Sequence, residues 1–208
     1  MLRIIGAGAE REGDIRVDEH IPLMIDWPRR PVPALWWMFS QPGSMLQTGF
    51  DAATGELVDV TLVVPGPIAS VDHGPPPAAP HTVRGTPRAD PAEWDRRTPH
   101  GAVKEFQDQY IREPLPVRTE LGPAHLLVRI GEEDEAAASE LVCGRLRAGL
   151  SAEQSLLWLC VDGFSPEERA LLDEHAGRSH ARPTMAPPTP APQRRGLSRF
   201  IDQLLKRG

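Results

Sequence analysis

The chain has 208 residues, of which 23 are proline, roughly twice the average usage. A chain of this length buries one sizeable core, so we expect one main domain with appendages. The net charge of −6 is unevenly distributed: residues 178–208 hold seven basic groups and one acid, and residues 1–177 hold 16 basic and 28 acidic groups. An acidic body disfavours nucleic acid as a partner and favours a basic protein surface.

Neither a targeting segment nor a disulfide framework is expected. The first residues lack the basic start and long apolar stretch of a signal peptide, and no segment approaches the ~20 apolar residues that span a bilayer. We therefore expect a cytoplasmic protein, and the preference for Arg over Lys, with abundant Ala, Gly and Pro, indicates a GC-rich bacterial genome. Cys143 and Cys160 lie in apolar runs without metal-site spacing, so we expect buried thiols that are not bonded to each other.

Short apolar runs bounded by Pro, Gly or charged residues predict a series of β-strands. The clearest pair is a hairpin, in which Asp51 opens a turn and Gly55 takes the positive φ that closes it. Its second strand alternates around Asp59 and Thr61, as expected for a strand with one buried face. The predicted strands cover residues 2–5, 21–25, 34–39, 45–51, 56–64, 117–121, 125–130 and 141–150.

Part of this hairpin recurs later in the chain. Leu46, Gly49, Ala52 and Leu57 correspond to Leu146, Gly149, Ala152 and Leu157. We interpret the recurrence as two hairpins of similar design, in two related halves of one sheet system. The alternative is that any two hairpins share a glycine and some leucines. Residues 151–154 also fit a helix-capping box, but Asp162 and Gly163 end the following run early, which favours a strand.

Two helices are predicted before the tail. Ser165, Pro166 and Glu168 form a capping box with proline at the first helical position, so this helix should run to about Ala176 and stop at Gly177. A shorter helix lies inside the Pro-rich connection 65–116 and is marked by Val103, Phe106, Tyr110 and Ile111.

The connection 65–116 is too long to be a structureless loop inside a compact domain. It either wraps the surface in extended form, anchored by Trp94 and the short helix, or its first part is disordered. Residues 73–80 contain four prolines and can form neither helix nor sheet, so they should be polyproline-like. The same holds for residues 183–192.

We therefore expect an α+β protein with a hairpin-built, mainly antiparallel β domain in residues 1–177. Residues 178–196 form a basic Pro-rich linker, and residues 197–208 form an amphipathic terminal helix. A helix of this length is marginal in water alone, so it should dock on the body, on a protein partner or on an anionic membrane surface. Its apolar stripe, with the spacing of one helix face, consists of Leu197, Phe200, Ile201, Leu204 and Leu205.

No residue pattern predicts a catalytic, cofactor-binding or metal-binding site. Gly6 and Gly8 follow the first strand, but the third glycine of a dinucleotide-binding turn is missing. His73 and His81 bracket the polyproline stretch and can meet in space, although flexible segments make poor preorganised sites. The densest group of carboxylates with a histidine matches no ligand spacing and is better explained as solvated; it comprises Asp14, Asp18, Glu19 and His20.

The densest aromatic patch supplies the candidate partner-binding residues of the domain. In an alternating strand, Trp36 and Trp37 point to opposite faces, so one belongs to the core and the other to the opposite surface. Aromatic side chains at a surface are favoured anchors of protein interfaces. The alternative is that the Pro-rich connection covers both rings. Trp36 and Trp37, with the stripe of the terminal helix, are therefore the partner-binding candidates.

Three hypotheses of function follow. The first is a non-catalytic protein-binding module of a bacterial cytosol, such as a small acidic inhibitor or immunity-type protein with a basic partner, reached by electrostatic attraction. The second is an accessory or cargo protein, tethered by its terminal helix to a protein assembly or an anionic membrane. The third is an enzyme of an unfamiliar family. The sequence leans against an enzyme and gives no prediction of oligomeric state.

Overall fold

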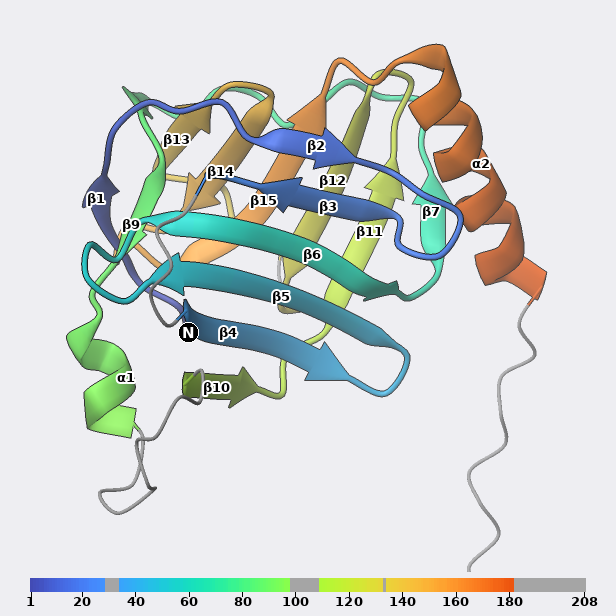
Figure 1. The fold of residues 1–208 in the computed structure, drawn as a ribbon. Helices are drawn as coiled ribbons and strands as arrows, with labels where there is room; N and C mark the ends of the chain where they lie inside the picture. Colours follow the sequence, from blue (N-terminus) through green and yellow to red (C-terminus); the bar gives the residue numbers. More distant parts are fainter. Residues whose placement is uncertain (29–33, 98–108, 133, 182–208) are drawn as a thin grey trace, which may run out of the picture.

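The computed structural model describes residues 1–28, 34–97, 109–132 and 134–181. They form a mostly β structure of two large sheets, one β-strand pair and two helices, α1 and α2. Figure 1 shows the two sheets packed face to face, with their strands crossing at a steep angle. The expectation of a mainly antiparallel, hairpin-built β domain with few helices is confirmed for these residues.

The first sheet has the order β10-β4-β5-β6-β3-β2, with β10 (Gln109–Glu113), β4 (Ala34–Gln41), β5 (Ser44–Asp51), β6 (Leu57–Pro65), β3 (Leu23–Asp26) and β2 (Asp14–Arg16). The second has the order β7-β11-β12-β15-β14-β13-β8, with β7 (Ile68–Ser70), β11 (Val117–Leu121), β12 (His125–Ile130), β15 (Leu156–Asp162), β14 (Leu146–Leu150), β13 (Ser139–Cys143) and β8 (His81–Arg84). The small pair joins β1 (Ile4–Ala7) to β9 (Pro87–Ala89).

The two sheets repeat one topology. The order β4-β5-β6-β3-β2 in the first sheet corresponds to β13-β14-β15-β12-β11 in the second. A parallel strand from the Pro-rich connection extends each of them, β10 beside β4 and β8 beside β13. The central hairpins, β5–β6 and β14–β15, both shift register at the same place, at Gly49 and at Gly149. The prediction of two similar hairpins is confirmed, but they lie in two sheets and not in one.

The turns of these hairpins use the same device. Asp51 Oδ1 accepts hydrogen bonds from the Ala53 and Thr54 N–H groups, both at 2.9 Å. Ser151 Oγ accepts from the N–H groups of residues 153 and 155, at 3.1 and 3.2 Å. Gly55 and Gln154 then take positive φ values of 73° and 64°. Ser151 therefore caps a turn, and the alternative of a helix start at this position is wrong.

The core lies between the sheets and is closed at one end by the connection. Trp37 points into it and meets Trp94 edge to face, with ring centroids 5.4 Å apart. Trp94 belongs to α1 (Ala92–Arg97), and its indole N–H donates to the Trp36 carbonyl at 3.0 Å. The connection is thus anchored by Trp94, as predicted, and its described parts wrap the body by adding strands to both sheets.

Helix α2 (Pro166–Ala181) begins as predicted and ends later. The capping box is present: the Ser165 N–H donates to the Glu168 carboxylate at 2.7 Å, and Ser165 Oγ accepts from the Glu168 N–H at 3.1 Å. The helix continues through Gly177 because no left-handed turn forms there, while Leu172 and Ala176 bury their side chains in the core. Packing outweighs the weak helix propensity of one glycine.

Two other predictions are wrong in detail. Residues 141–150 are not one strand, because Gly144 takes a φ of 59° and turns the chain between β13 and β14. Cys143 consequently faces Leu146 and Cys160 faces Arg147, and both thiols are buried and free, as expected. Tyr110 and Ile111 lie in β10, paired with β4, and not in a helix; the rest of that predicted helix lies outside the described residues.

We predict opposite effects of two Gly→Ala substitutions. A Cβ at Gly149 would overlap the Trp158 indole, so Gly149→Ala should lower the free energy of unfolding by about 1–3 kcal/mol. A Cβ at Gly177 meets open space on α2, so Gly177→Ala should raise it by up to about 1 kcal/mol. Urea unfolding of both variants measures the two changes, and equal effects would contradict the packing at Gly149.

Candidate functional site

Residues 71–80 cross one whole face of the second sheet, and we call them the strap. They contain no helix or strand, and they join β7 at one edge to β8 at the other (Figure 1). The six intervals between these edges span roughly 29 Å at about 4.8 Å per strand. The eleven residue steps from Ser70 to His81 reach roughly 34 Å in a polyproline helix of ~3.1 Å rise. The strap is therefore nearly fully extended.

The sheet face beneath the strap is turned away from the main core and carries an apolar cluster of its own. Leu127 from β12 and Trp158 from β15 are buried in this cluster, with Ala137 packed against it. The indole of Trp158 lies close against the backbone of Gly149 on the neighbouring strand. We call this surface the outer face of the second sheet.

Arg147, on β14, connects the outer face to the strap. It pairs with Glu140 at 2.7 Å, and its guanidinium lies 5.6 Å from the Trp158 ring centroid. Its Nη1 atom donates to the Pro76 carbonyl at 3.0 Å. Glu140 is only 3% exposed, so Arg147 neutralises a buried carboxylate and at the same time holds the middle of the strap.

A second group of charges lies further along the same face. Arg129 Nε donates to Glu120 at 3.0 Å and is 3.7 Å from Asp134, which also pairs with Arg118 at 2.8 Å. The hydrogen bond from Arg118 holds the pKa of Asp134 below its usual value. His73, in the strap, has its Nε2 atom 4.0 Å from Glu120. The arginines of this group are thus already engaged by carboxylates of the protein itself.

A cavity of about 720 Å³ lies between the strap and the outer face, and we call it the strapped groove. This volume falls within the roughly 300–1,000 Å³ of small-ligand sites. The strap forms its roof, Leu127 and Trp158 form its floor, and the chain after β12 forms one wall. Its lining outside the strap consists of Leu127, Arg129, Asp134, Glu135, Ala136, Ala137 and Trp158.

His125 lies on the outer face near the His73 end of the strap. Its ring centroid is 6.3 Å from that of His73, and it is 1% exposed. Neither ring nitrogen has a hydrogen-bond partner among the described residues. Burial, and then the nearby His73, lower the pKa of His125 below its usual value. His73 and His81 lie toward opposite ends of the extended strap: His73 is beside Glu120 and His125, on β11 and β12, whereas His81 belongs to the edge strand β8.

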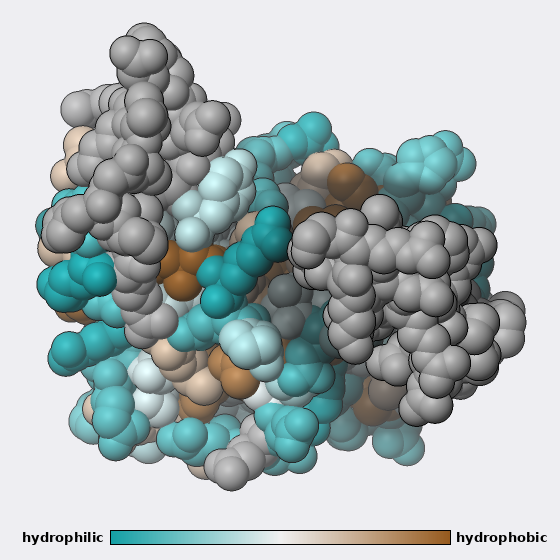
Figure 2. Space-filling model, turned by 90° about the horizontal axis from the view of Figure 1, so that it is seen from below, coloured by the Kyte–Doolittle hydropathy of each residue, from teal (hydrophilic) through white to brown (hydrophobic). Residues whose placement is uncertain are grey.

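The structure separates the two predicted tryptophans as expected. Trp37 is fully buried in the core, whereas Trp36 lies on the other side of β4 over Gly49 and is 9% exposed. Trp36 stacks on Tyr110 of the edge strand β10, with ring centroids 6.3 Å apart, and Tyr110 is 53% exposed. Seen from below, where β10 and α1 lie, the described surface is a mosaic of hydrophilic residues with small apolar areas (Figure 2).

The remaining sequence candidates do not form a site in the structure. Asp18 accepts two hydrogen bonds of 2.7 Å from the backbone of residues 20 and 21, which makes a turn and lowers the pKa of its carboxyl group. Among the residues that the structure describes, no group of His, Cys, Asp or Glu has the arrangement of a metal site. The stripe of the terminal helix, Leu197, Phe200, Ile201, Leu204 and Leu205, lies outside the described residues.

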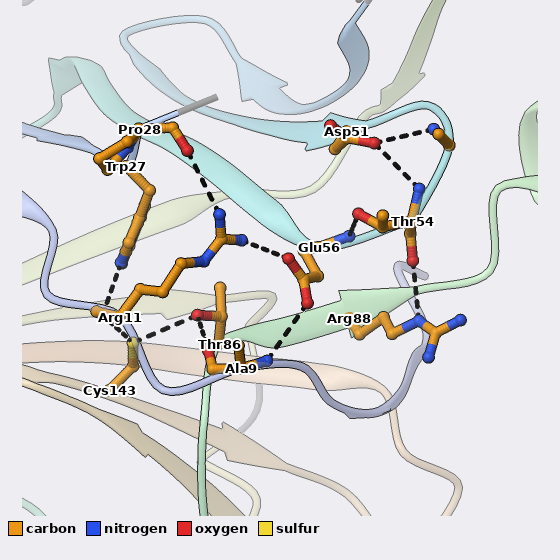
Figure 3. Close-up of polar contacts among 11 residues, drawn as sticks. Ala9, Arg11, Trp27, Pro28, Asp51, Thr54, Glu56, Thr86, Arg88 and Cys143 are labelled. Carbon is orange, nitrogen blue, oxygen red and sulfur yellow. Dashed lines mark hydrogen bonds and ion pairs between the residues drawn. The ribbon is translucent and has the colours of Figure 1, made fainter. Parts of the chain in front are cut away.

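Gly8 has a structural role beside a set of polar contacts (Figure 3). A Cβ at Gly8 would overlap the carboxylate of Glu56, which accepts from the Ala9 N–H at 3.2 Å and pairs with Arg11. The Arg11 carbonyl accepts from Cys143 Sγ at 2.8 Å. This segment therefore joins the residue that precedes β6 of the first sheet to the end of β13 of the second, which accounts for the close approach of the backbone at Gly8.

Sequence reasoning missed the strapped groove itself. Leu127, Arg147 and Trp158 lie in three different strands, and the strap approaches them only because β7 and β8 occupy opposite edges. The polyproline composition of the strap was visible, but its path was not. The one usable signal was Arg129, which interrupts the apolar run of β12 and lies on the same face of the strand as Leu127, two residues before it.

Comparison with known proteins gives no functional assignment. No model of a protein family matches the chain, and no curated protein sequence is similar to it. Within the described ranges, neither α1 nor α2 is long and apolar enough to cross a membrane.

We predict that Arg147→Met destabilises the protein strongly, because it leaves the buried Glu140 carboxylate without its cation. The free energy of unfolding should fall by about 3–5 kcal/mol, and the double variant Arg147→Met/Glu140→Gln should recover most of that loss. In a matched control, Arg16→Met breaks the exposed pair with Asp26 and should change stability by less than about 1 kcal/mol. Denaturant unfolding compares the three variants.

We also predict that His125 makes the stability depend on pH. Its pKa is lowered from the usual 6.5, so below that pH the unfolded chain binds a proton that the folded chain excludes. Stability should therefore fall as the pH is lowered from about 7 to 5, and His125→Gln should remove this part of the fall. His20→Gln, at an exposed position, should leave the fall unchanged. Thermal unfolding across this pH range provides the measurement, and an unaltered slope in His125→Gln would refute it.

Proposed function

We propose that this protein is a non-catalytic binding module of the bacterial cytosol, and that its acidic surface binds a basic surface of a protein partner. In its most concrete form it is a small acidic inhibitor of the immunity type. The observation that supports this proposal best is a group of acidic residues, Glu132, Asp134 and Glu135, in the segment that follows β12 beside the strapped groove. Asp134 and Glu135 of this group line the groove directly.

The charges around the groove favour a basic partner over an acidic one. The arginines there are paired with the protein's own carboxylates, and the carboxylates outnumber them. The charged groups are Arg118, Arg129 and Arg147 against Glu120, Glu132, Asp134, Glu135 and Glu140. An apolar floor with a charged margin is also the usual anatomy of a protein interface. The acidic body as a whole, with 16 basic and 28 acidic groups in residues 1–177, attracts the same kind of partner.

We predict that association with the partner depends on these acidic residues. After capture from the native cell extract and identification by mass spectrometry, the partner should associate more slowly with Glu132→Gln/Glu135→Gln and at higher salt. Its dissociation rate should change little, because exposed charges steer the encounter more than they hold the complex.

The matched control neutralises two exposed acids away from the groove, in Asp14→Asn/Glu19→Gln. Both residues belong to the region of β2 and β3 and are more than two-thirds exposed, at 73% and 72%. This variant should associate at nearly the rate of the unchanged protein. Association rates that respond to neither pair of substitutions, nor to salt, would refute the electrostatic part of the proposal.

A further inference from the structure

We propose that the strapped groove is a peptide-binding slot that takes one bulky apolar side chain from a basic, extended segment of the partner. This inference rests on the proposed function and specifies its chemistry. Three observations support it: the groove is held open, its floor is apolar and aromatic, and its margin and roof select for positive charge and hydrogen-bond donors.

The groove is held open by the stiffness of the strap and by Arg147 beneath it. A polyproline segment is stiff, and this one is only about 5 Å longer than the sheet it crosses by the lengths given above. Arg147 stands between the strap and Trp158: its guanidinium lies 5.6 Å from the Trp158 ring centroid, and its Nη1 atom donates to the Pro76 carbonyl at 3.0 Å. The middle of the strap is therefore held one side chain above the indole. A preformed cavity spares an incoming segment the cost of opening one.

The floor suits a large apolar side chain. Leu127 and Trp158 close the bottom of the groove and are 0% and 3% exposed, and Ala137 leaves room beside them because its side chain is small. The apolar surface that an occupant meets comes mainly from the alanines of the wall and the prolines of the strap, namely Ala136, Ala137, Pro75, Pro77 and Pro80. The groove is open to solvent, so an apolar side chain that enters it releases water from these apolar groups, which stabilises the bound state. Burial of a leucine or phenylalanine side chain is the interaction that the floor favours most.

The roof and the margin suit a peptide with positive charge. Four of the eight residues 73–80 are proline, which lacks an N–H group, so the strap presents carbonyl acceptors more than donors. Glu132 and Glu135 are exposed beside the groove and have no ion-pair partner among the described residues. Peptide N–H groups and Lys or Arg side chains satisfy these acceptors, whereas phosphate groups would be repelled.

The test uses the full chain and short synthetic peptides, acetyl-Gly-Arg-X-Gly-Arg-Gly-amide, in which X is Ala, Leu or Phe. A second series has Glu in place of both Arg residues. Calorimetry should show that the Leu and Phe peptides bind about tenfold or more tightly than the Ala peptide, as expected for the burial of one such side chain. The acidic series should bind at least tenfold more weakly than the basic one.

The site of binding is read from the indole N–H signals of the ¹⁵N-labelled protein. The chain has five tryptophans, and the Trp158→Phe variant assigns the signal of interest. The Phe peptide should shift the Trp158 signal and leave that of Trp37, in the main core, unchanged. Ala137→Trp fills the groove and should abolish the preference for Leu and Phe, whereas Ala53→Trp, in the exposed β5–β6 turn, should retain it.

The outcomes separate this inference from the proposed function. Basic peptides that bind equally for all three X residues, or that shift Trp36 and not Trp158, would overturn the slot and leave the basic partner intact. Preference for X with no preference for basic flanks would overturn the charge selection. If Ala137→Trp does not fold, the peptide series and the Trp158 signal still decide the question.

Discussion

Only ten residues, 71–80, connect the two edge strands of the second sheet, so this short segment has to reach across the whole sheet. That constraint determines much of the structure around it. It forces the crossing segment into an extended conformation, which prolines adopt without loss of backbone hydrogen bonds because they have no N–H group. The segment joins two edge strands, β7 and β8, each of which runs parallel to its neighbour in the sheet. The groove is a by-product of this path.

The repeated topology shows how one framework carries two different surfaces. In each central hairpin a glycine leaves a gap on the outer side of the sheet because it has no side chain, and an indole ring fills that gap. The indole comes from opposite neighbours: Trp36 on β4 lies over Gly49, and Trp158 on β15 lies over Gly149. The first surface extends to an exposed tyrosine on an edge strand, and the second is roofed by the strap. The halves therefore share their backbone arrangement and differ in what covers it.

The sequence predicted those strands and helices whose own residues carry the characteristic pattern, such as alternation or a capping box. The hairpin of residues 45–64 and the strands β11 and β12 were predictable because alternation, β-branched residues and turn residues coincide there. The start of α2 was predictable from its capping box. Strand β8 was not, because all four of its residues are exposed and it is positioned by its pairing with the backbone of β13, which the local sequence does not show. Tyr110 and Ile111 were misassigned for the same reason, since β4 supplies the partner that the local pattern does not show.

The buried thiol of Cys160 can report on local opening of the outer face. It is 1% exposed and faces Leu127 across the β12–β15 pair, and burial raises the pKa of the thiol to about 12. At neutral pH it is protonated and inaccessible, so a thiol reagent modifies it only when this part of the molecule opens. The rate at which a thiol reagent modifies Cys160 therefore measures how often the outer face opens locally, and the natural side chain serves as the probe.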